Sequence, residues 1–272
     1  MNGRSVQRRR IVALRDGTAR PRSDELAAEE PLEIRVSGDV VAVTMRTPGN
    51  DFELALGFCL SEGIVTGAEQ VESIRYCTGP RGAGDYNVVE LALRSGATVP
   101  QEQRRRTYTT SSCGLCGTTS IEAVRKQAPA VDGDGASLSV ATLVGMPATL
   151  RAAQRAFDRT GGLHAAGLFT TDGTLHCLRE DVGRHNAVDK VIGWAATERL
   201  LPLRGFVLLV SGRVAFEIAQ KALLAGIPIV AAVSAPSSLA VDLAGESGMT
   251  LVGFLRGSEL NVYAGAQRID GL

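Results

Sequence analysis

Two cysteines, Cys113 and Cys116, lie in the stretch SSCGLCGTTSIEAV with a C-x-x-C spacing. Thiols this close can bind a metal, exchange electrons as a dithiol, or carry sulfur as a persulfide. Thr119 and Glu122 form a capping box, which predicts a helix over SIEAVRKQ directly after the cysteines. The partial positive charge of that helix N-terminus lowers the pKa of a nearby thiol, so this position favours a reactive thiolate.

The cysteine pair does not supply a complete metal site. Structural zinc requires four ligands, and the other cysteines (Cys59, Cys77 and Cys177) each fall alone in a predicted helix or strand. A zinc deaminase pairs H-x-E with a later P-C-x-x-C, whereas His164 is followed by two alanines and comes after the cysteine pair. We therefore predict no metal site, and interpret His164 as a core histidine. Electron transfer and sulfur transfer stay equally open.

A second set of polar residues follows the apolar segments of the C-terminal half. The run DVGRHN occupies a predicted strand-to-helix turn, and three apolar strands end in SGR, SAPSS and RGSE. Ligands of open α/β sheets bind beyond the carboxyl ends of the strands, so these ends predict a phosphate-binding edge. Its candidate residues are Arg184, His185, Asn186, Ser211, Gly212, Arg213, Ser234, Ser237 and Arg256. In the alternative interpretation they form plain turns, and Asp181 or Asn186 caps the helix.

The elements that must position these residues divide the chain into three parts. Residues 1–30 carry blocks of arginine and then of acid, which predict a flexible, solvated tail or a partner-binding arm. Residues 31–140 predict a β-rich α+β subdomain with a mobile cysteine-bearing loop at 107–119, and with a helix after its Asn50 cap. In residues 141–272, a helix over 142–158 precedes apolar strands that alternate with helices. This pattern predicts an α/β, αβα domain with a parallel sheet.

Composition excludes several other classes of protein. The 272 residues have a formal net charge of zero and 44% hydrophobic content, so no whole-chain field attracts nucleic acid or membrane. Five cysteines are too few and odd in number for a secreted disulfide framework. The longest apolar stretch, LLAGIPIVAAV, is too short to span a bilayer. We expect a cytoplasmic protein.

Several runs, taken in order, resemble one known family. They are CGLCG, GGLHAAGLF, REDVGRHNAVDKVIG, the SGR strand end, IVAAVSAPSSLAVDLA and TLVGFLRG with LNVYAG. Together they resemble the formate dehydrogenase accessory sulfurtransferases, the FdhD family, over roughly residues 31–269. The REDVGRHNAVDK run is the most specific part of this resemblance.

The resemblance implies a sulfur carrier with a fold similar to that of cytidine deaminase. Cys113 would take sulfur from a cysteine desulfurase as a persulfide, with help from Cys116, and pass it to the molybdenum bis-molybdopterin guanine dinucleotide cofactor of formate dehydrogenase. The family also implies a cytoplasmic homodimer. Guanine dinucleotide binding maps to Phe254, Leu255, Arg256, Gly257, Ser258 and Glu259. Two alternatives remain: a non-catalytic chaperone that binds the cofactor, and a dithiol redox protein.

Overall fold

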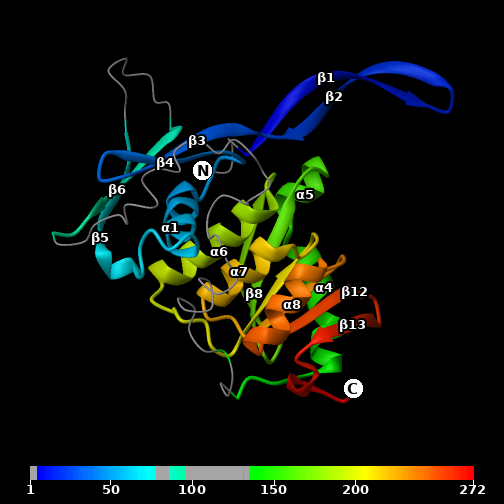
Figure 1. Cartoon of the computed structure of the whole chain (residues 1–272). Helices are drawn as coiled ribbons and strands as arrows, with labels where there is room; N and C mark the ends of the chain where they lie inside the picture. Colours follow the sequence, from blue (N-terminus) through cyan, green and yellow to red (C-terminus); the bar gives the residue numbers. More distant parts are fainter. Residues whose placement is uncertain (1–4, 78–85, 96–130, 132–134) are drawn as a thin grey trace.

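The computed structural model describes residues 5–77, 86–95, 131 and 135–272. Cys113, Cys116, the predicted loop 107–119 and the helix predicted after it lie outside the described residues. The described residues form two sheets of different size, each with helices packed on it, and a projecting N-terminal hairpin (Figure 1). The α/β class predicted from the sequence is confirmed.

A six-stranded sheet forms the larger unit, in the order β13-β12-β11-β10-β8-β9. The central strands β10, β11 and β12 are parallel, as their apolar runs predict, while β8, β9 and β13 run antiparallel to their neighbours. The strands are β8 (His164–Thr170), β9 (Leu175–Asp181), β10 (Phe206–Val210), β11 (Ile229–Ala232), β12 (Thr250–Arg256) and β13 (Glu259–Ala264). The sheet is therefore mixed, because β13 joins one end of the parallel core and the β8–β9 hairpin adds two strands at the other.

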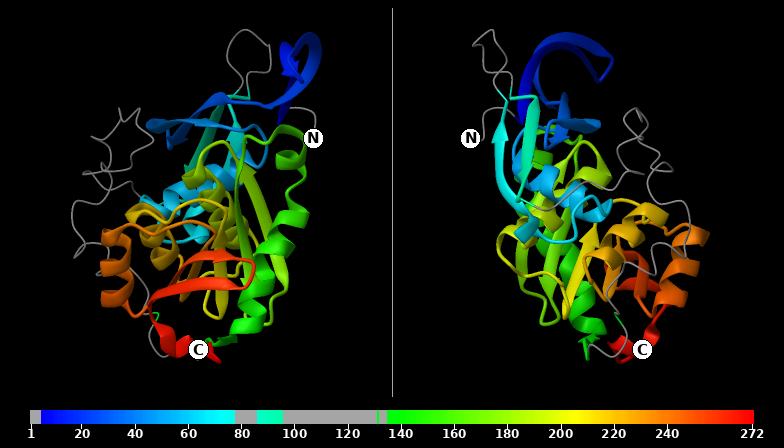
Figure 2. Two further views of the ribbon diagram at one scale, coloured as in Figure 1. Left: turned by 90° about the vertical axis from the view of Figure 1, so that its right-hand side faces the viewer. Right: turned by 60° about the vertical axis from the view of Figure 1, so that its left-hand side comes forward.

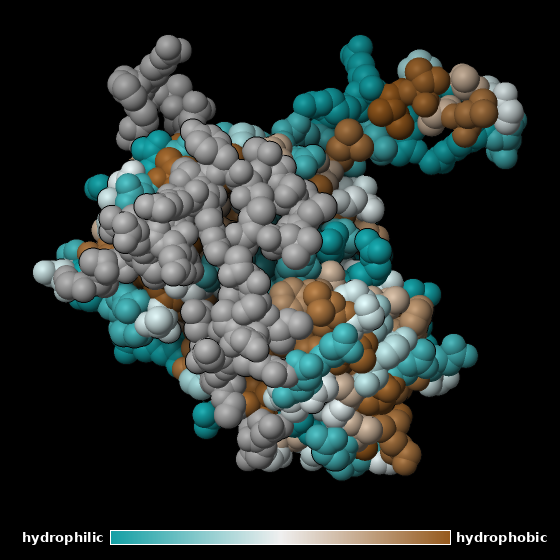
Figure 3. All heavy atoms as spheres, viewed as in Figure 1, coloured by the Kyte–Doolittle hydropathy of each residue, from teal (hydrophilic) through white to brown (hydrophobic). Residues whose placement is uncertain are grey.

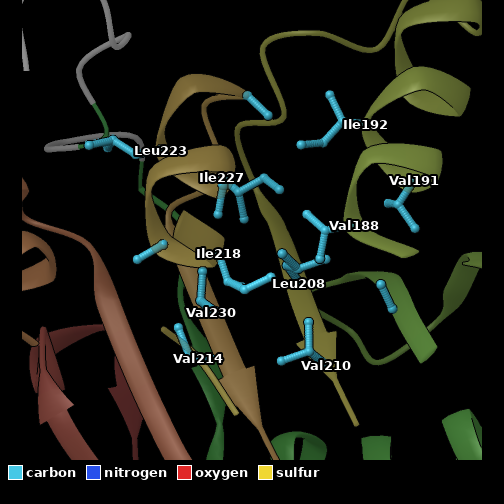
Figure 4. Packing of buried hydrophobic residues seen from close by; sticks show 14 of the residues in the cluster. Val188, Val191, Ile192, Leu208, Val210, Val214, Ile218, Leu223, Ile227 and Val230 are labelled. Carbon is cyan, nitrogen blue, oxygen red and sulfur yellow. The ribbon is translucent and has the colours of Figure 1, made fainter. Parts of the chain in front are cut away.

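Helices cover both faces of this sheet, which explains why its central strands are apolar throughout. Helices α6 (Arg184–Thr197), α7 (Phe216–Leu224) and α8 (Ser238–Ser247) pack on one face. Helix α4 (Val140–Ala153) packs on the other, and Figure 2 shows α4 and α8 on opposite sides of the strands. In Figure 4, Val188 of α6 lies next to Leu208 of β10. The αβα layering is thus present, while the likeness to cytidine deaminase stays a prediction.

The helix predicted over residues 142–158 is two helices in the structure. Helix α4 ends before Gln154, whose backbone leaves the helical region, and α5 (Arg155–Thr160) follows. The Glu180 carboxylate accepts hydrogen bonds from the amides of Ala156 (2.9 Å) and Phe157 (2.7 Å). A distant carboxylate therefore satisfies the first amides of a new helix, and local periodicity could not reveal the break.

The smaller unit is a four-stranded sheet in the order β4-β3-β6-β5, covered on one face by α1 (Asp51–Ser61). The hairpin predicted over residues 31–48 and the two later strands are confirmed as β3 (Glu30–Val36), β4 (Asp39–Arg46), β5 (Val71–Tyr76) and β6 (Val88–Leu93). Between α1 and β5 lies the short helix η1 (Ala68–Gln70). Asn50 is the N-cap residue of α1, as predicted, although its side chain makes no capping hydrogen bond.

The two units meet where α1 crosses α6 with their backbones in contact. A Cβ added to Gly57 of α1 would overlap the carbonyl of Asp189, and one added to Gly193 of α6 would overlap the carbonyl of Glu53. Glycine is the only residue that permits this approach. The crossing fixes α6, and with it the start of α6, relative to the smaller sheet.

Regular structure replaces the irregular tail predicted for residues 1–30. Strands β1 (Val6–Arg15) and β2 (Thr18–Ala27) pair as an antiparallel hairpin, which we call the arm. Asp16 and Gly17 form its turn with φ of 50° and 75°, the left-handed values that a two-residue type I′ turn requires. Glu25 bonds Arg8 (3.2 Å) and Arg159 of α5 (2.8 Å) at the base of the arm.

Two further strands join the chain end to the larger unit. Strand β7 (Leu138–Ser139) pairs in parallel with β14 (Ile269–Asp270), after the short helix η2 (Ala266–Arg268). Arg268 also donates to the carbonyls of Gly248 and Val131. Within the part of the chain that the structure describes, no helix is long and apolar enough to cross a membrane.

The α1–α6 crossing predicts opposite outcomes for two glycine substitutions. Gly193→Ala should lower the free energy of unfolding by about 2 kcal/mol or more, because the backbones must separate to admit the methyl group. Gly145→Ala in α4 is the control, since a Cβ there meets nothing within 4 Å, and it should raise stability by up to about 1 kcal/mol. Urea unfolding of both variants measures this. Equal midpoints for the two would contradict the close crossing.

Candidate functional site at the strand-end edge

Polar segments gather along one edge of the larger sheet. The carboxyl ends of β10, β11 and β12 share this edge because the strands are parallel. Antiparallel pairing brings the first residue of β8, His164, opposite the last residue of β9, Asp181, at the same edge. We call this region the strand-end edge; it comprises residues 181–186, 211–215, 234–238 and 254–259 together with His164. The convergence predicted from the sequence is thus present in the fold.

Arg184 and His185 begin α6 at this edge and each has a polar atom without a partner. Arg184 Nε and His185 Nε2 are buried, and no described protein group bonds them. Burial, with the positive charges of Arg184 and Lys221, lowers the pKa of His185 to about 4. Its imidazole is therefore neutral at neutral pH and can donate or accept one hydrogen bond. Buried polar atoms normally have partners, so two adjacent exceptions suit a bound ligand or water.

His164 belongs to the same cluster, although its lone position on an apolar strand indicated only a core residue. A Cβ added to Gly212 would lie 3.3 Å from His164 Nδ1, so the SGR turn passes directly over the ring. Burial and the charge of Arg184 lower the pKa of His164. The charge of His164 in turn helps to lower the pKa of His185. The sequence signal that could have identified His164 is its register opposite Asp181, which requires the hairpin pairing.

Asn186, also predicted to bind the cofactor, is buried and turned toward the smaller sheet. Its Nδ2 donates to the carbonyl of Met45 (2.8 Å) and to Asp181 Oδ1 (3.0 Å), and Thr44 Oγ1 lies 3.3 Å from its Oδ1. Gly183 is the N-cap of α6, so neither Asp181 nor Asn186 is the cap residue. Asn186 therefore positions the turn that carries Arg184 and His185.

A buried ion pair between Asp181 and Lys190 supports this turn. Asp181 is fully buried, and its Oδ2 lies 2.7 Å from Lys190 Nζ and accepts the amide of Thr47 at 3.0 Å. Its Oδ1 accepts the amide of Gly183 at 2.8 Å. Lys190 also donates to the carbonyl of Thr47 (2.9 Å). Asp181 thus ties the backbone just before Arg184, at Gly183, to Lys190 of α6 and to Thr47.

The SGR and SAPSS turns lie side by side along the edge. Ser211 already bonds the neighbouring strand: its Oγ accepts a hydrogen bond from the amide of Ala165 (2.9 Å), and its own amide donates to the Ala165 carbonyl. Gly212 allows the approach to His164, and Arg213 is exposed. Val214 pairs with Pro236 as an isolated parallel bridge, which aligns the two turns. Ser234 accepts the amide of Phe254 through its backbone carbonyl (3.1 Å).

The segment Phe254–Glu259 forms the end of β12, a tight turn and the start of β13. Phe254 has a positive φ of 53° and a ring that is 38% exposed, while Leu255 is buried in the core. Arg256 Nε donates to the carbonyl of Val233 (2.7 Å), and its guanidinium lies 5.8 Å from the centre of the Phe254 ring. Gly257, Ser258 and Glu259 are exposed at the hairpin turn. This segment offers an exposed aromatic face beside an arginine.

Three helix N-termini point their first amides toward the same edge. Helices α6 and α7 follow Gly183 and Ala215, which provide no side-chain cap, whereas Ser237 caps α8 by accepting the amide of Ala240 (3.3 Å). Uncapped amides and the helix dipoles favour anions. With Arg184, Arg213 and Arg256 nearby, the edge suits a phosphate-bearing ligand. Among the described residues, no group of three or more His, Cys, Asp or Glu side chains could hold a metal ion.

The described cysteines are poor sulfur nucleophiles where they are buried. Burial raises the pKa of the Cys59 thiol, and it raises the pKa of Cys177 to about 12. Cys77 is half-buried at the end of β5. The thiolate chemistry predicted for Cys113 and Cys116 falls outside the described residues and stays a prediction.

A cavity of about 1130 Å³ lies away from the strand-end edge. It opens between α1, β5 and the segment that follows α6, with Leu56, Ile74 and Pro202 among its lining residues. Ala196 and Thr197 line it at the far end of α6 from His185. The cavity and the polar edge are therefore separate features of the protein.

Comparisons with known proteins point to one family. The FdhD/NarQ family model matches residues 27–270. The sulfur carrier protein FdhD of Mycolicibacterium paratuberculosis is 59% identical over 270 residues, covering 97% of this chain and 98% of that protein. Its namesake from Streptomyces coelicolor is 56% identical over 272 residues, covering 98% and 96%. A crystal structure assigned as a formate dehydrogenase accessory protein from Desulfotalea psychrophila has a TM-score of 0.75 and 26% identity, covering 97% of this chain and 99% of that chain.

The buried neutral state of His185 predicts a pH dependence of stability. Its folded pKa of about 4 lies below the ordinary 6.5, so between these values the unfolded state binds more protons and stability falls as pH falls. His185→Gln should reduce the stability loss between pH 7 and pH 4 by about 2 kcal/mol. His176→Gln, at an exposed histidine, is the control. Urea unfolding across this range measures both, and identical pH slopes in the two variants would contradict the buried site.

Proposed function

Because this chain belongs to the FdhD/NarQ family, we propose that it is a sulfur carrier in the maturation of formate dehydrogenase. The observation that carries the proposal is the identity of 56–59% with sulfur carrier proteins along almost the whole chain. The strand-end edge supports it, since orphaned polar atoms, arginines and helix N-termini gather where a phosphate-bearing cofactor would be held.

In this proposal Cys113 is the sulfur-carrying residue. Its thiolate attacks the outer sulfur of a persulfide on a cysteine desulfurase, which forms a Cys113 persulfide and releases the donor cysteine as a thiolate. Burial of Cys59 and Cys177 leaves them unsuited to this role. Cys116, three residues further on, assists or relays the sulfur.

The acceptor is the bis-molybdopterin guanine dinucleotide cofactor of formate dehydrogenase, handled here as cargo. Arg184 and Arg256 bind its phosphates, neutral His185 donates or accepts one hydrogen bond, and Phe254 stacks on the guanine. Delivery breaks the S–S bond, returns Cys113 to a thiolate and requires the metal centre to supply two electrons. Holding the cofactor in place provides the rate advantage. The protein works as a homodimer in the cytoplasm.

Replacement of Cys113 separates a sulfur carrier from a chaperone that only binds the cofactor. In a strain that lacks the native gene, Cys113→Ala should abolish formate dehydrogenase activity, whereas the control Cys77→Ala should retain it, because only the carrier thiol takes up sulfur. Full activity of Cys113→Ala would instead support a chaperone that binds the cofactor without carrying sulfur.

Mass spectrometry of the 113–116 peptide gives a direct readout of the sulfur. After incubation with a cysteine desulfurase and cysteine, the wild-type peptide should gain about 32 Da, the mass of one sulfur atom. Reduction with a thiol should remove the added mass. A loss of two hydrogens with no added sulfur would contradict sulfur carriage and indicate a dithiol redox protein.

A further inference from the structure

The arm presents an apolar face that the proposed function does not use. In its ladder Val12 is opposite Pro21 and Leu14 is opposite Ala19, and directly opposed residues share one face of a hairpin. The side chains of Val12 and Leu14 are 72% and 71% exposed, the highest values among large apolar residues in the described chain. Figure 3 shows apolar atoms gathered along the projecting part of the arm.

A hairpin of this kind is marginally stable when it stands alone in water. Its base is held by the ion pairs of Glu25, but its outer part extends away from the body in all three ribbon views (Figures 1 and 2). Exposed apolar residues on a projecting ribbon indicate a surface that another molecule covers.

The distribution of charge along the chain indicates which molecule covers the arm. The arm, residues 6–27, holds six arginines and three acidic residues, so the other 250 residues hold 23 basic and 26 acidic side chains. The arm therefore carries +3 and the rest of the chain −3. A second copy of this chain offers a body of opposite charge, while two arms placed against each other would repel.

The smaller sheet offers a matching surface. Helix α1 covers the face that carries Leu32 and Ile34, and no described helix covers the other face. On that outer face Val43 and Met45 of β4 are 44% and 47% exposed. Their cross-strand neighbours are Glu33 and Pro31, and the Glu33 carboxylate pairs with Arg35 of the same strand.

We propose that the arm of one copy packs its apolar face on the outer face of the smaller sheet of a second copy, and that the exchange is reciprocal. The arm leads directly into β3 of this sheet, so both surfaces lie in one part of each copy. A two-fold axis then produces two identical contacts and a closed dimer. The inference rests on the homodimer of the proposed function and names the surface that forms it.

Sedimentation velocity of the full chain tests the contact. The wild type should be a dimer, whereas Val12→Ser with Leu14→Ser should weaken dimerisation at least ~100-fold, because four exposed apolar side chains are lost from the two contacts. Val43→Ser with Met45→Ser should produce the same loss from the receiving side. Ile11→Ser with Ala13→Ser changes the opposite face of the same strand and should leave the dimer intact. Thermal melting confirms that each variant folds.

A photo-crosslinker in place of Leu14 identifies the occupant. Mixed with isotope-labelled chain, it should crosslink to residues 30–46 of a second copy. A monomeric wild type, a dimer that survives both double substitutions, or crosslinks only to formate dehydrogenase, lipid or nucleic acid would each overturn the inference. Sulfur loading of Cys113 uses a different readout, so failure here leaves the proposed function standing.

Discussion

The close crossing of α1 and α6 is the constraint on which the rest of the structure depends. Gly57 and Gly193 let the two backbones touch, and the helices join the cores of the smaller and larger sheets. The first turn of α6 carries Arg184 and His185 into the strand-end edge. A shift of α6 by one side-chain diameter would move both residues relative to the loops after β10 and β11. Packing far from the edge therefore sets its geometry.

Buried ion pairs reinforce this crossing. Asp189 of α6 bonds Lys221 of α7 at 2.9 Å and Ser61 of α1 at 2.7 Å, so one carboxylate ties three helices together. Asp181 and Lys190 do the same for β9, α6 and the backbone at Thr47. Burying charges is costly, and removing one member of a buried pair typically costs about 3–5 kcal/mol. These pairs hold α6 in one orientation relative to α1, α7 and β9.

The sequence predicted the features that depend on local pattern. The apolar runs FVLLV and IPIVAAV gave the central parallel strands, and their polar ends gave most of the strand-end edge. The sequence did not reveal the features that depend on contacts between residues distant in the chain. The Glu180 carboxylate starts α5, a hairpin register places His164 beside the SGR turn, and cross-strand pairing orders the charged N-terminus. The sequence predicts Asn186 as a ligand-binding residue, since nothing local reveals its bond to Met45 of β4, 141 residues away.

Binding of guanosine diphosphate, which represents the phosphate-bearing end of the proposed cargo, tests the central claim most directly. In isothermal titration calorimetry the wild type should bind it, and Arg184→Gln should weaken binding by at least about tenfold, because a charge-assisted phosphate contact is lost. Arg199→Gln, at the far end of α6, is the matched control and should bind as the wild type does. Equal affinity in Arg184→Gln and the wild type would contradict the assignment of the strand-end edge as the cofactor site.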